Sequence, residues 1–99
     1  MAVTPQFNET IHAPLRLRIC GMLRHVERLE FAVVRDTLGV SDATLSKHLK
    51  VLSDADLITV NKEASHARSD ARRLTWIGLT RAGTAALAGH MAALAEIAG

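Results

Sequence analysis

The sequence is poor in the residues on which disulfide-bonded and aromatic-rich folds depend. It has one cysteine, Cys20, no tyrosine, and only two phenylalanines and one tryptophan. A single cysteine excludes an internal disulfide and a metal site of several thiolates within one chain. We expect Cys20 to be a buried, unreactive thiol, because the alternative of a redox or metal sensor lacks partner residues. A core of Leu, Ile, Val and Ala favours helices over a β-sandwich.

Long apolar runs and an export signal are also missing. No apolar run approaches the ~20 residues that span a bilayer, and residues 1–9 lack the basic and apolar regions of a secretory signal. With 48% hydrophobic and 22% charged residues, the composition is that of a globular protein. We expect a cytoplasmic protein with no membrane partner. It would consist of a flexible N-terminal arm, 1–10, and a single domain, 11–98.

The sequence offers no pattern for catalysis or for a cofactor. It contains no glycine-rich phosphate loop, no nucleophile elbow and no closely spaced His–carboxylate pair. The five histidines are scattered, without the i, i+4 spacing of a ligand pair on a helix. We therefore expect no enzyme and no cofactor or metal within one chain, while a metal site shared across a dimer stays open.

The chain has little excess of either charge: twelve Lys and Arg against ten Asp and Glu leave a net charge of +2. Binding to an anionic partner must then depend on where the basic residues lie, not on their total. Half of the Lys and Arg residues lie between positions 47 and 73: Lys47, Lys50, Lys62, Arg68, Arg72 and Arg73. Four acidic residues lie in the same stretch, Asp54, Asp56, Glu63 and Asp70, so the local excess of positive charge is small.

In the first half of the sequence, apolar residues recur at helical spacing. Apolar residues at i, i+4, i+7, i+8 and i+11 predict a helix over 14–26. The segment Phe31–Leu38 predicts a two-turn helix that ends at Gly39, where a left-handed conformation suits glycine. Ser41 is a favoured N-cap for the next helix, 41–54, in which one apolar face has helical spacing: Leu45, Leu49 and Leu52.

The second half of the sequence changes to a period of two after Leu57. Ile58–Glu63 and Arg72–Leu79 predict the two strands of a hairpin with basic residues at its loop. We expect Trp76 to lie in the core, bridging the hairpin to the helices. Thr80 then caps a last helix with apolar residues at helical spacing: Leu87, Met91 and Leu94.

The order helix, helix, turn, helix, hairpin, helix is that of a winged helix. VSDATLSKHLKVLSDADLI (40–58) resembles the recognition-helix segment of bacterial winged-helix transcriptional regulators of the ArsR and MarR type. HAPLRLRICGML (12–23) is similar to their first helix, and RRLTWIGLTRAG (72–83) to their second wing strand and the start of their last helix. The cysteine-bearing motifs through which ArsR relatives sense metals are absent.

The resemblance implies both a fold and a function. The fold is α+β, mostly α: a winged helix-turn-helix with a two-stranded wing, a possible short third strand and a C-terminal dimerisation helix. The function is a sequence-specific DNA-binding transcriptional regulator, a homodimeric repressor that reads an inverted repeat through helix 41–54 and the wing, 64–73. The alternative is a winged helix used for protein–protein contact without specific DNA binding. The polar helix and basic wing favour DNA.

The candidate DNA contacts lie on the helix and on the wing. Near the helix N-terminus, Ala43 and Thr44 can offer methyl groups to thymine, and Lys47 can reach guanine. The full set of expected contacts is Ser41, Asp42, Ala43, Thr44, Ser46, Lys47, Lys50, His66, Arg68, Arg72 and Arg73. The helix cations could instead form a solvated face, and Arg72 and Arg73 could shield a strand edge. His48 is more often a packed, hydrogen-bonded residue than a base reader.

A partner chain is expected because one winged helix reads only a few base pairs. The apolar stripe of the last helix, with help from the first, is the candidate dimer interface: Leu15, Leu17, Leu87, Met91 and Leu94. The alternative is that this stripe packs only on its own hairpin and first helix. Whether a small-molecule effector exists stays open.

Overall fold

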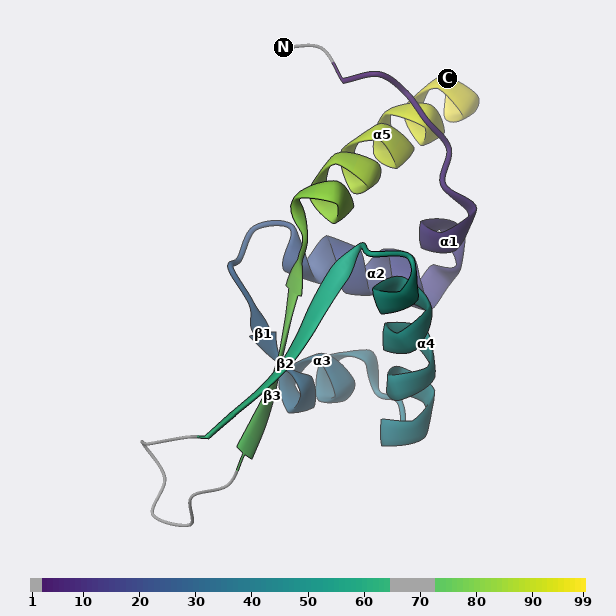
Figure 1. The fold of residues 1–99 in the computed structure, drawn as a ribbon. Helices are drawn as coiled ribbons and strands as arrows, with labels where there is room; N and C mark the ends of the chain where they lie inside the picture. Colours follow the sequence, from purple (N-terminus) through teal and green to yellow (C-terminus); the bar gives the residue numbers. More distant parts are fainter. Residues whose placement is uncertain (1–2, 65–72) are drawn as a thin grey trace.

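A computed structural model describes residues 3–64 and 73–99 (Figure 1). The helices and strands of these residues follow in the order α1, α2, β1, α3, α4, β2, β3 and α5. Their bounds are α1 Glu9–His12, α2 Pro14–Leu23, β1 Leu29–Glu30, α3 Phe31–Leu38, α4 Asp42–Asp54, β2 Ile58–Ala64, β3 Arg73–Leu79 and α5 Arg81–Ala98. No described helix is long and apolar enough to cross a membrane.

A three-stranded antiparallel sheet holds the chain together in the order β1-β3-β2. The hairpin β2–β3 pairs from Ile58 opposite Leu79 to Ala64 opposite Arg73. On the other edge of β3, Leu29 lies opposite Ile77. The short third strand is therefore present, and the architecture is the predicted α+β, mostly α one.

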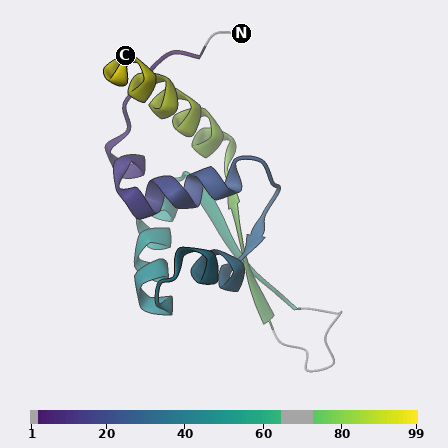
Figure 2. The same cartoon turned by 180° about the vertical axis from the view of Figure 1, so that it is seen from behind.

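The core lies between one face of the sheet and the helices. Ile77 of β3 is completely buried, as are Ile19 of α2, Val34 of α3 and Leu52 of α4. The view from behind shows α2 crossing this side of the molecule, between α5 and the pair α3–α4 (Figure 2). Cys20 is buried in the same cluster, as expected, and burial raises the pKa of its thiol to about 11. At neutral pH it is an unreactive thiol.

Trp76 does not lie in the core, which corrects the expectation from the sequence. Side chains alternate between the two faces of a strand, so Trp76 points away from the face that Ile77 buries. The tryptophan is half-buried on the outer face, where the Arg28 guanidinium lies 4.1 Å from the ring centroid. A cation over the ring covers apolar area there without placing the indole among the helices.

The turns and caps largely follow the local sequence. Gly39 has φ of 67°, the left-handed conformation that the glycine predicted. Ser41 and Thr80 accept hydrogen bonds from the backbone N–H groups of Thr44 and Gly83, so both are N-caps. Only α2 is shorter than predicted: it ends at Leu23 instead of residue 26, because the chain turns there toward β1.

The N-terminal segment is more structured than the flexible arm expected for 1–10. The Asn8 side chain caps α1 by accepting from Ile11 N–H at 2.9 Å, and Gln6 N–H donates to the Gly89 carbonyl of α5. Gly89 permits this approach, since a Cβ there would lie 3.3 Å from the Thr4 carbonyl oxygen. The segment is therefore attached to the last helix from about residue 6 onward.

Candidate nucleic-acid interface

A tight turn joins α3 to α4 and fixes which face of α4 is exposed. The Arg35 carbonyl at the end of α3 accepts from the N–H groups of Gly39 and Val40, at 2.9 and 3.3 Å. Leu45, Leu49 and Leu52 are buried, with exposed fractions of 1%, 4% and 0%. The opposite side of α4 therefore faces solvent over its whole length.

That exposed side is small and polar near the helix N-terminus, as the sequence predicted. Ala43, Ser46, Lys47 and Lys50 are exposed, and Thr44 is half-buried. Among the described residues no acidic side chain forms an ion pair with Lys47. A row of short side chains next to a cation without a counter-ion can approach an anionic surface closely.

Ser41 contributes mainly through the geometry of the helix. Its hydroxyl oxygen accepts from Thr44 N–H at 3.1 Å, and its hydroxyl donates to the Thr44 Oγ1 at 3.0 Å. Because Thr44 Oγ1 accepts, its own hydrogen stays available to an outside acceptor. The cap therefore orients Thr44 as well as satisfying the helix end.

Ion pairs engage three of the four charged side chains of α4: Asp42, Lys50 and Asp54. Arg35 donates to Asp42 from Nη1 at 2.9 Å and to Asp36 from Nε at 2.9 Å. These hydrogen bonds, first from Asp36 and then from Asp42, raise the pKa of Arg35. Lys50 pairs with Asp54 one turn later, with 3.0 Å between Nζ and Oδ2. Asp42 is thus a partner of Arg35, a link that the sequence pattern did not reveal.

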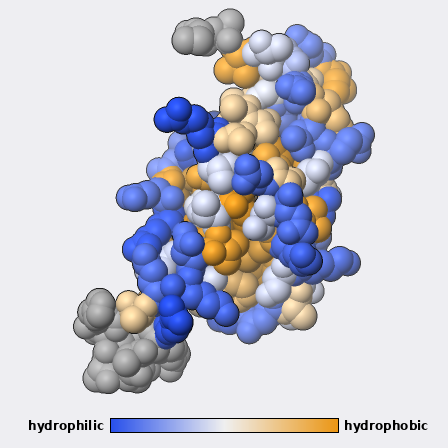
Figure 3. Space-filling model, viewed as in Figure 1, coloured by the Kyte–Doolittle hydropathy of each residue, from blue (hydrophilic) through white to orange (hydrophobic). Residues whose placement is uncertain are grey.

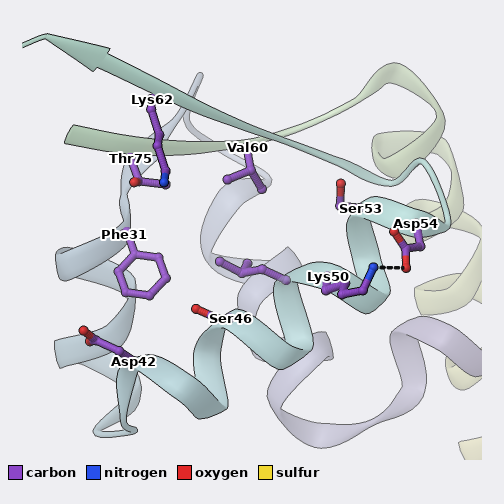
Figure 4. Close-up of a pocket in the computed structure, with 10 residues that line it drawn as sticks. Phe31, Asp42, Ser46, Lys50, Ser53, Asp54, Val60, Lys62 and Thr75 are labelled. Atoms are coloured by element: carbon purple, nitrogen blue, oxygen red, sulfur yellow. Dashed lines mark hydrogen bonds and ion pairs between the residues drawn. The ribbon is translucent and has the colours of Figure 1, made fainter. Parts of the chain in front are cut away.

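A groove of about 650 Å³ separates α4 from the wing strands, the name used here for β2 and β3 (Figure 4). An apolar floor with hydrophilic borders is visible on this face in Figure 3. The lining residues are Phe31, Asp42, Ser46, Leu49, Lys50, Ser53, Asp54, Val60, Lys62 and Thr75. Of these, Lys62 and Thr75 lie opposite each other on β2 and β3. The sequence counted Lys62 among the basic residues but assigned it no contact.

The predicted site residues divide into four groups. Three of them line the groove: Asp42, Ser46 and Lys50. Four others at or near the start of α4 do not line it: Ser41, Ala43, Thr44 and Lys47. Arg73 is exposed at the start of β3, where its Nη2 lies 3.5 Å from the Lys62 carbonyl oxygen. Three wing residues lie outside the described part of the chain: His66, Arg68 and Arg72.

His48 is a packed and hydrogen-bonded residue, as expected. Arg16 Nη1 lies 3.2 Å from His48 Nδ1, and Arg16 Nε donates to the Thr10 carbonyl at 2.6 Å. Burial, and then the charges of Arg16 and Lys47, lower the pKa of His48. A neutral imidazole that accepts from Arg16 joins α4 to α2, so it supports the helix from behind.

The expected dimer residues differ widely in exposure. Leu87 is only 4% exposed and belongs to the core of its own chain, so it is not part of an uncovered stripe. Leu15, Leu17 and Leu94 are half-buried, the first two against that core. Met91, at 41%, is the exposed member of the set. Two exposed alanines lie one helical turn before and after it, Ala88 and Ala95.

The described residues contain no group of three or more His, Cys, Asp or Glu that could hold a metal ion. The nearest approach is a pair, His12 and His90, at 3.3 Å between ring nitrogens. Two imidazoles are fewer than the four ligands of a structural zinc site.

Comparison with known proteins gives a family and a set of similar folds. The sequence model of the family described as "Winged helix DNA-binding domain" matches residues 15–98. No curated protein sequence matches the chain. A transcriptional regulator homologue from Pyrococcus horikoshii is similar in structure, with a TM-score of 0.83 and 20% identity over 92% of this chain and 86% of that one.

Two further structures extend the comparison. HlyU from Vibrio cholerae has a TM-score of 0.67 and 23% identity, with 87% of this chain and 84% of that chain covered. A mutant of Lactococcus lactis ZitR in complex with DNA has a TM-score of 0.60 and 21% identity, over 97% of this chain and 62% of that one. The chain thus spans less than two thirds of ZitR. At such identities the structural likeness establishes the fold.

Proposed function

We propose, starting from the fact that the chain belongs to the winged helix DNA-binding domain family, that it is a transcriptional regulator that binds a specific DNA sequence. The proposal includes a homodimer, repression, and an inverted repeat as the target. It describes a binding role without catalysis, in the cytoplasm, where bacterial DNA lies. The partner in this proposal is double-stranded DNA, and the structure of ZitR in complex with DNA supports the choice of DNA.

The observation that carries the proposal is the exposed polar face of α4 beside the wing strands. The 13 residues of α4 form a helix about 20 Å long. With its side chains an α-helix is about 10–12 Å across, so it fits the major groove of B-DNA, which is about 12 Å wide. Ala43 and Thr44 would then face base edges with their methyl groups, and Ser46 either a base or a phosphate. Lys47, without an acidic partner among the described residues, would reach guanine.

The contacts at the edges of this interface are phosphate contacts in the proposal. Lys50 would exchange Asp54 for a phosphate, and the N-terminus of α4 at Asp42 would favour an anion through its dipole. The wing would meet the flanking backbone or minor groove through His66, Arg68, Arg72 and Arg73.

Selection of bound duplexes from a random-sequence pool tests the proposal directly. We expect the full chain to enrich one motif with two-fold symmetry and half-sites about one helical turn apart. Lys47→Ala should change the enriched motif, whereas Arg18→Ala, which removes a charge from the exposed side of α2, should not. Equal affinity for all duplexes would contradict sequence-specific binding and favour a protein-interaction module. Arg68→Ala, on the wing, should weaken all duplexes alike.

The homodimer in this proposal uses the exposed face of α5. Met91 is 41% exposed, and the alanines beside it would allow a second copy of the helix to approach closely. Met91→Glu places a charge in that interface and should halve the mass measured by light scattering. Val33→Glu is the matched control, because Val33 is 47% exposed on α3. A monomeric mass for the unmodified chain would overturn this part of the proposal.

A further inference from the structure

The groove between α4 and the wing strands has polar walls from both sides. Ser46 and Lys50 belong to the helix wall, and Lys62 and Thr75 to the strand wall (Figure 4). Because Lys62 and Thr75 are cross-strand neighbours, an ammonium group and a hydroxyl face the helix from one point of the sheet. The floor between these walls is apolar, and includes Leu49 and Val60.

The acidic residues of the groove are already paired. Asp42 accepts from Arg35, and Asp54 from Lys50. Glu63, the neighbour of Lys62, points to the other face of the sheet, where Arg28 pairs with it at 2.5 Å. Within residues 3–64 and 73–99 no acidic side chain forms an ion pair with Lys62. Lys62 is therefore the groove's positive charge for which those residues offer no counter-ion.

The geometry of B-DNA connects this groove to the proposed interface. A sugar–phosphate backbone separates the major groove from each adjacent minor groove. If α4 lies in the major groove while the wing reaches the next minor groove, that backbone must pass between α4 and the wing strands. The space between them is the groove.

We propose that this groove binds the sugar–phosphate backbone of one DNA strand. Lys62 and Thr75 donate to phosphate oxygens from the wing side, Ser46 donates from the helix side, and the apolar floor contacts deoxyribose. The inference rests on the proposed function and extends it to two residues, Lys62 and Thr75, that the sequence pattern did not assign. Phosphate contacts fix the register of a protein on the duplex, so these residues position α4 without reading bases.

The ion pair Lys50–Asp54 becomes part of the same site. Both side chains line the groove, with 3.0 Å between Lys50 Nζ and Asp54 Oδ2. A phosphate that enters competes with the Asp54 carboxylate for Lys50 and is repelled by that carboxylate. Asp54 therefore opposes binding, and its removal should strengthen it.

Salt-dependent binding of a random-sequence duplex of about 30 base pairs, roughly three helical turns, tests the inference. Lys62→Gln should weaken binding about three- to tenfold near 0.1 M salt and reduce the slope of log K against log salt by about one. Arg18→Gln is the matched control, because it removes the same charge from α2, outside the groove. Lys62→Arg keeps the charge and should keep the slope.

Asp54→Asn should change the DNA affinity in the opposite direction from Lys62→Gln. It should tighten binding by about threefold, because it removes a negative charge next to the phosphate path and releases Lys50. The change suits the fold, since an acidic residue in the last turn of a helix opposes the helix dipole. Thermal unfolding of each variant separates a folding defect from a lost contact.

The outcomes separate the two proposals. If the unmodified chain binds but Lys62→Gln has the slope of Arg18→Gln, the groove does not hold the backbone, while DNA binding by α4 stands. If Asp54→Asn weakens binding, the assigned path of the backbone is also wrong. Absence of any binding by the unmodified chain overturns the proposed function, and this inference with it.

Discussion

The two longest helices of the described residues, α4 and α5, begin with the same kind of N-cap but differ in the side chains that they bury. Each starts at a hydroxyl N-cap, Ser41 or Thr80. Along α4 most polar side chains face solvent, and three of its four charged groups, Asp42, Lys50 and Asp54, form surface ion pairs. In contrast, α5 buries a histidine, His90, and two glycines, Gly83 and Gly89. The buried residues of α5 are therefore determined by packing within the chain. The exposed polar face of α4 is not required for that packing and is available to a binding partner.

The sharpest way to test this comparison is Gly83→Ala in α5. A Cβ at Gly83 would lie 1.9 Å from the Leu57 carbonyl oxygen, a backbone atom that cannot move away without shifting β2. We expect a loss of roughly 3 kcal/mol or more in the free energy of unfolding, measured by urea denaturation.

The control for that substitution is Gly21→Ala in α2. Nothing lies within 4 Å of a Cβ there, so the change should stabilise the helix by about 0.5–1 kcal/mol. If both substitutions have the same small effect, the close contact between Gly83 of α5 and the Leu57 carbonyl, just before β2, is not a constraint on the fold.

The two caps give the next largest difference. Ser41→Ala should lower the free energy of unfolding by about 1 kcal/mol, the usual value for an N-cap. Thr80→Ala should lower it by roughly 2 kcal/mol, because its hydroxyl also donates to the backbone carbonyl of Asp56, 24 positions away, at 2.8 Å. The second hydrogen bond of the Ser41 hydroxyl goes only to the side chain of Thr44, in the same turn. Thr80→Ser keeps both hydrogen bonds and should recover most of the loss. Equal losses for Ser41→Ala and Thr80→Ala would contradict the extra role of the second cap.

The buried His90 predicts a gradual pH dependence of stability. Its Nδ1 accepts from Asn8 N–H at 2.9 Å, so the ring proton lies on Nε2 and points to His12 Nδ1 at 3.3 Å. Burial, and then the charge of His12, lower the pKa of His90 in the folded chain. Between this lowered pKa and the unfolded value of about 6.5, the unfolded state binds more protons.

The contribution of His90 to stability should therefore be complete above its unfolded pKa of about 6.5 and decrease as the pH falls below that value. Urea denaturation at several pH values measures this slope. His90→Gln should reduce this slope but not abolish it, because the pKa of His48 is also lowered in the folded chain. His25→Gln, at an exposed position after α2, should keep the slope. A titration of His90 by NMR with an unshifted or raised pKa would contradict the assignment.

The smallest expected effect on stability belongs to α4. Lys50→Gln breaks the pair with Asp54, and both side chains are mostly exposed, at 76% and 65%. Such i, i+4 pairs contribute about 0.3–0.5 kcal/mol, so unfolding should barely change. DNA binding should nevertheless weaken. A large loss of stability with unchanged DNA binding would contradict the view that the exposed face of α4 serves binding and not packing.

Features carried by local sequence were the ones that could be predicted. Ser41 and the spacing of the three buried leucines placed α4 to the residue, and Gly39 placed the left-handed turn before it. These signals depend on neighbours within one or two helical turns. The wing strands followed in the same way from their period of two.

Features that depend on distant partners could not be predicted. The period of two in β3 predicts that Trp76 and Ile77 point to opposite faces of the sheet, but it does not predict which face packs against the helices. In the structure that face carries Ile77, which is fully buried. The structured part of the N-terminal segment depends on a hydrogen bond from Asn8 to His90, 82 positions away. Lys62 lines the groove only because β2 lies opposite α4 in the folded chain, and the sequence pattern does not show this arrangement.

The pairing of β1 with β3 has a consequence for how the chain folds. The helix pair α3–α4 and the hairpin β2–β3 each contain mostly local contacts, which form early. Strand β1, however, has no sheet partner until β3 has been synthesised, and the fully buried Ile77 arrives with it. During translation, α2 to α4 would thus emerge with one side of their core still open. Completion of β3 should close that core and make folding cooperative.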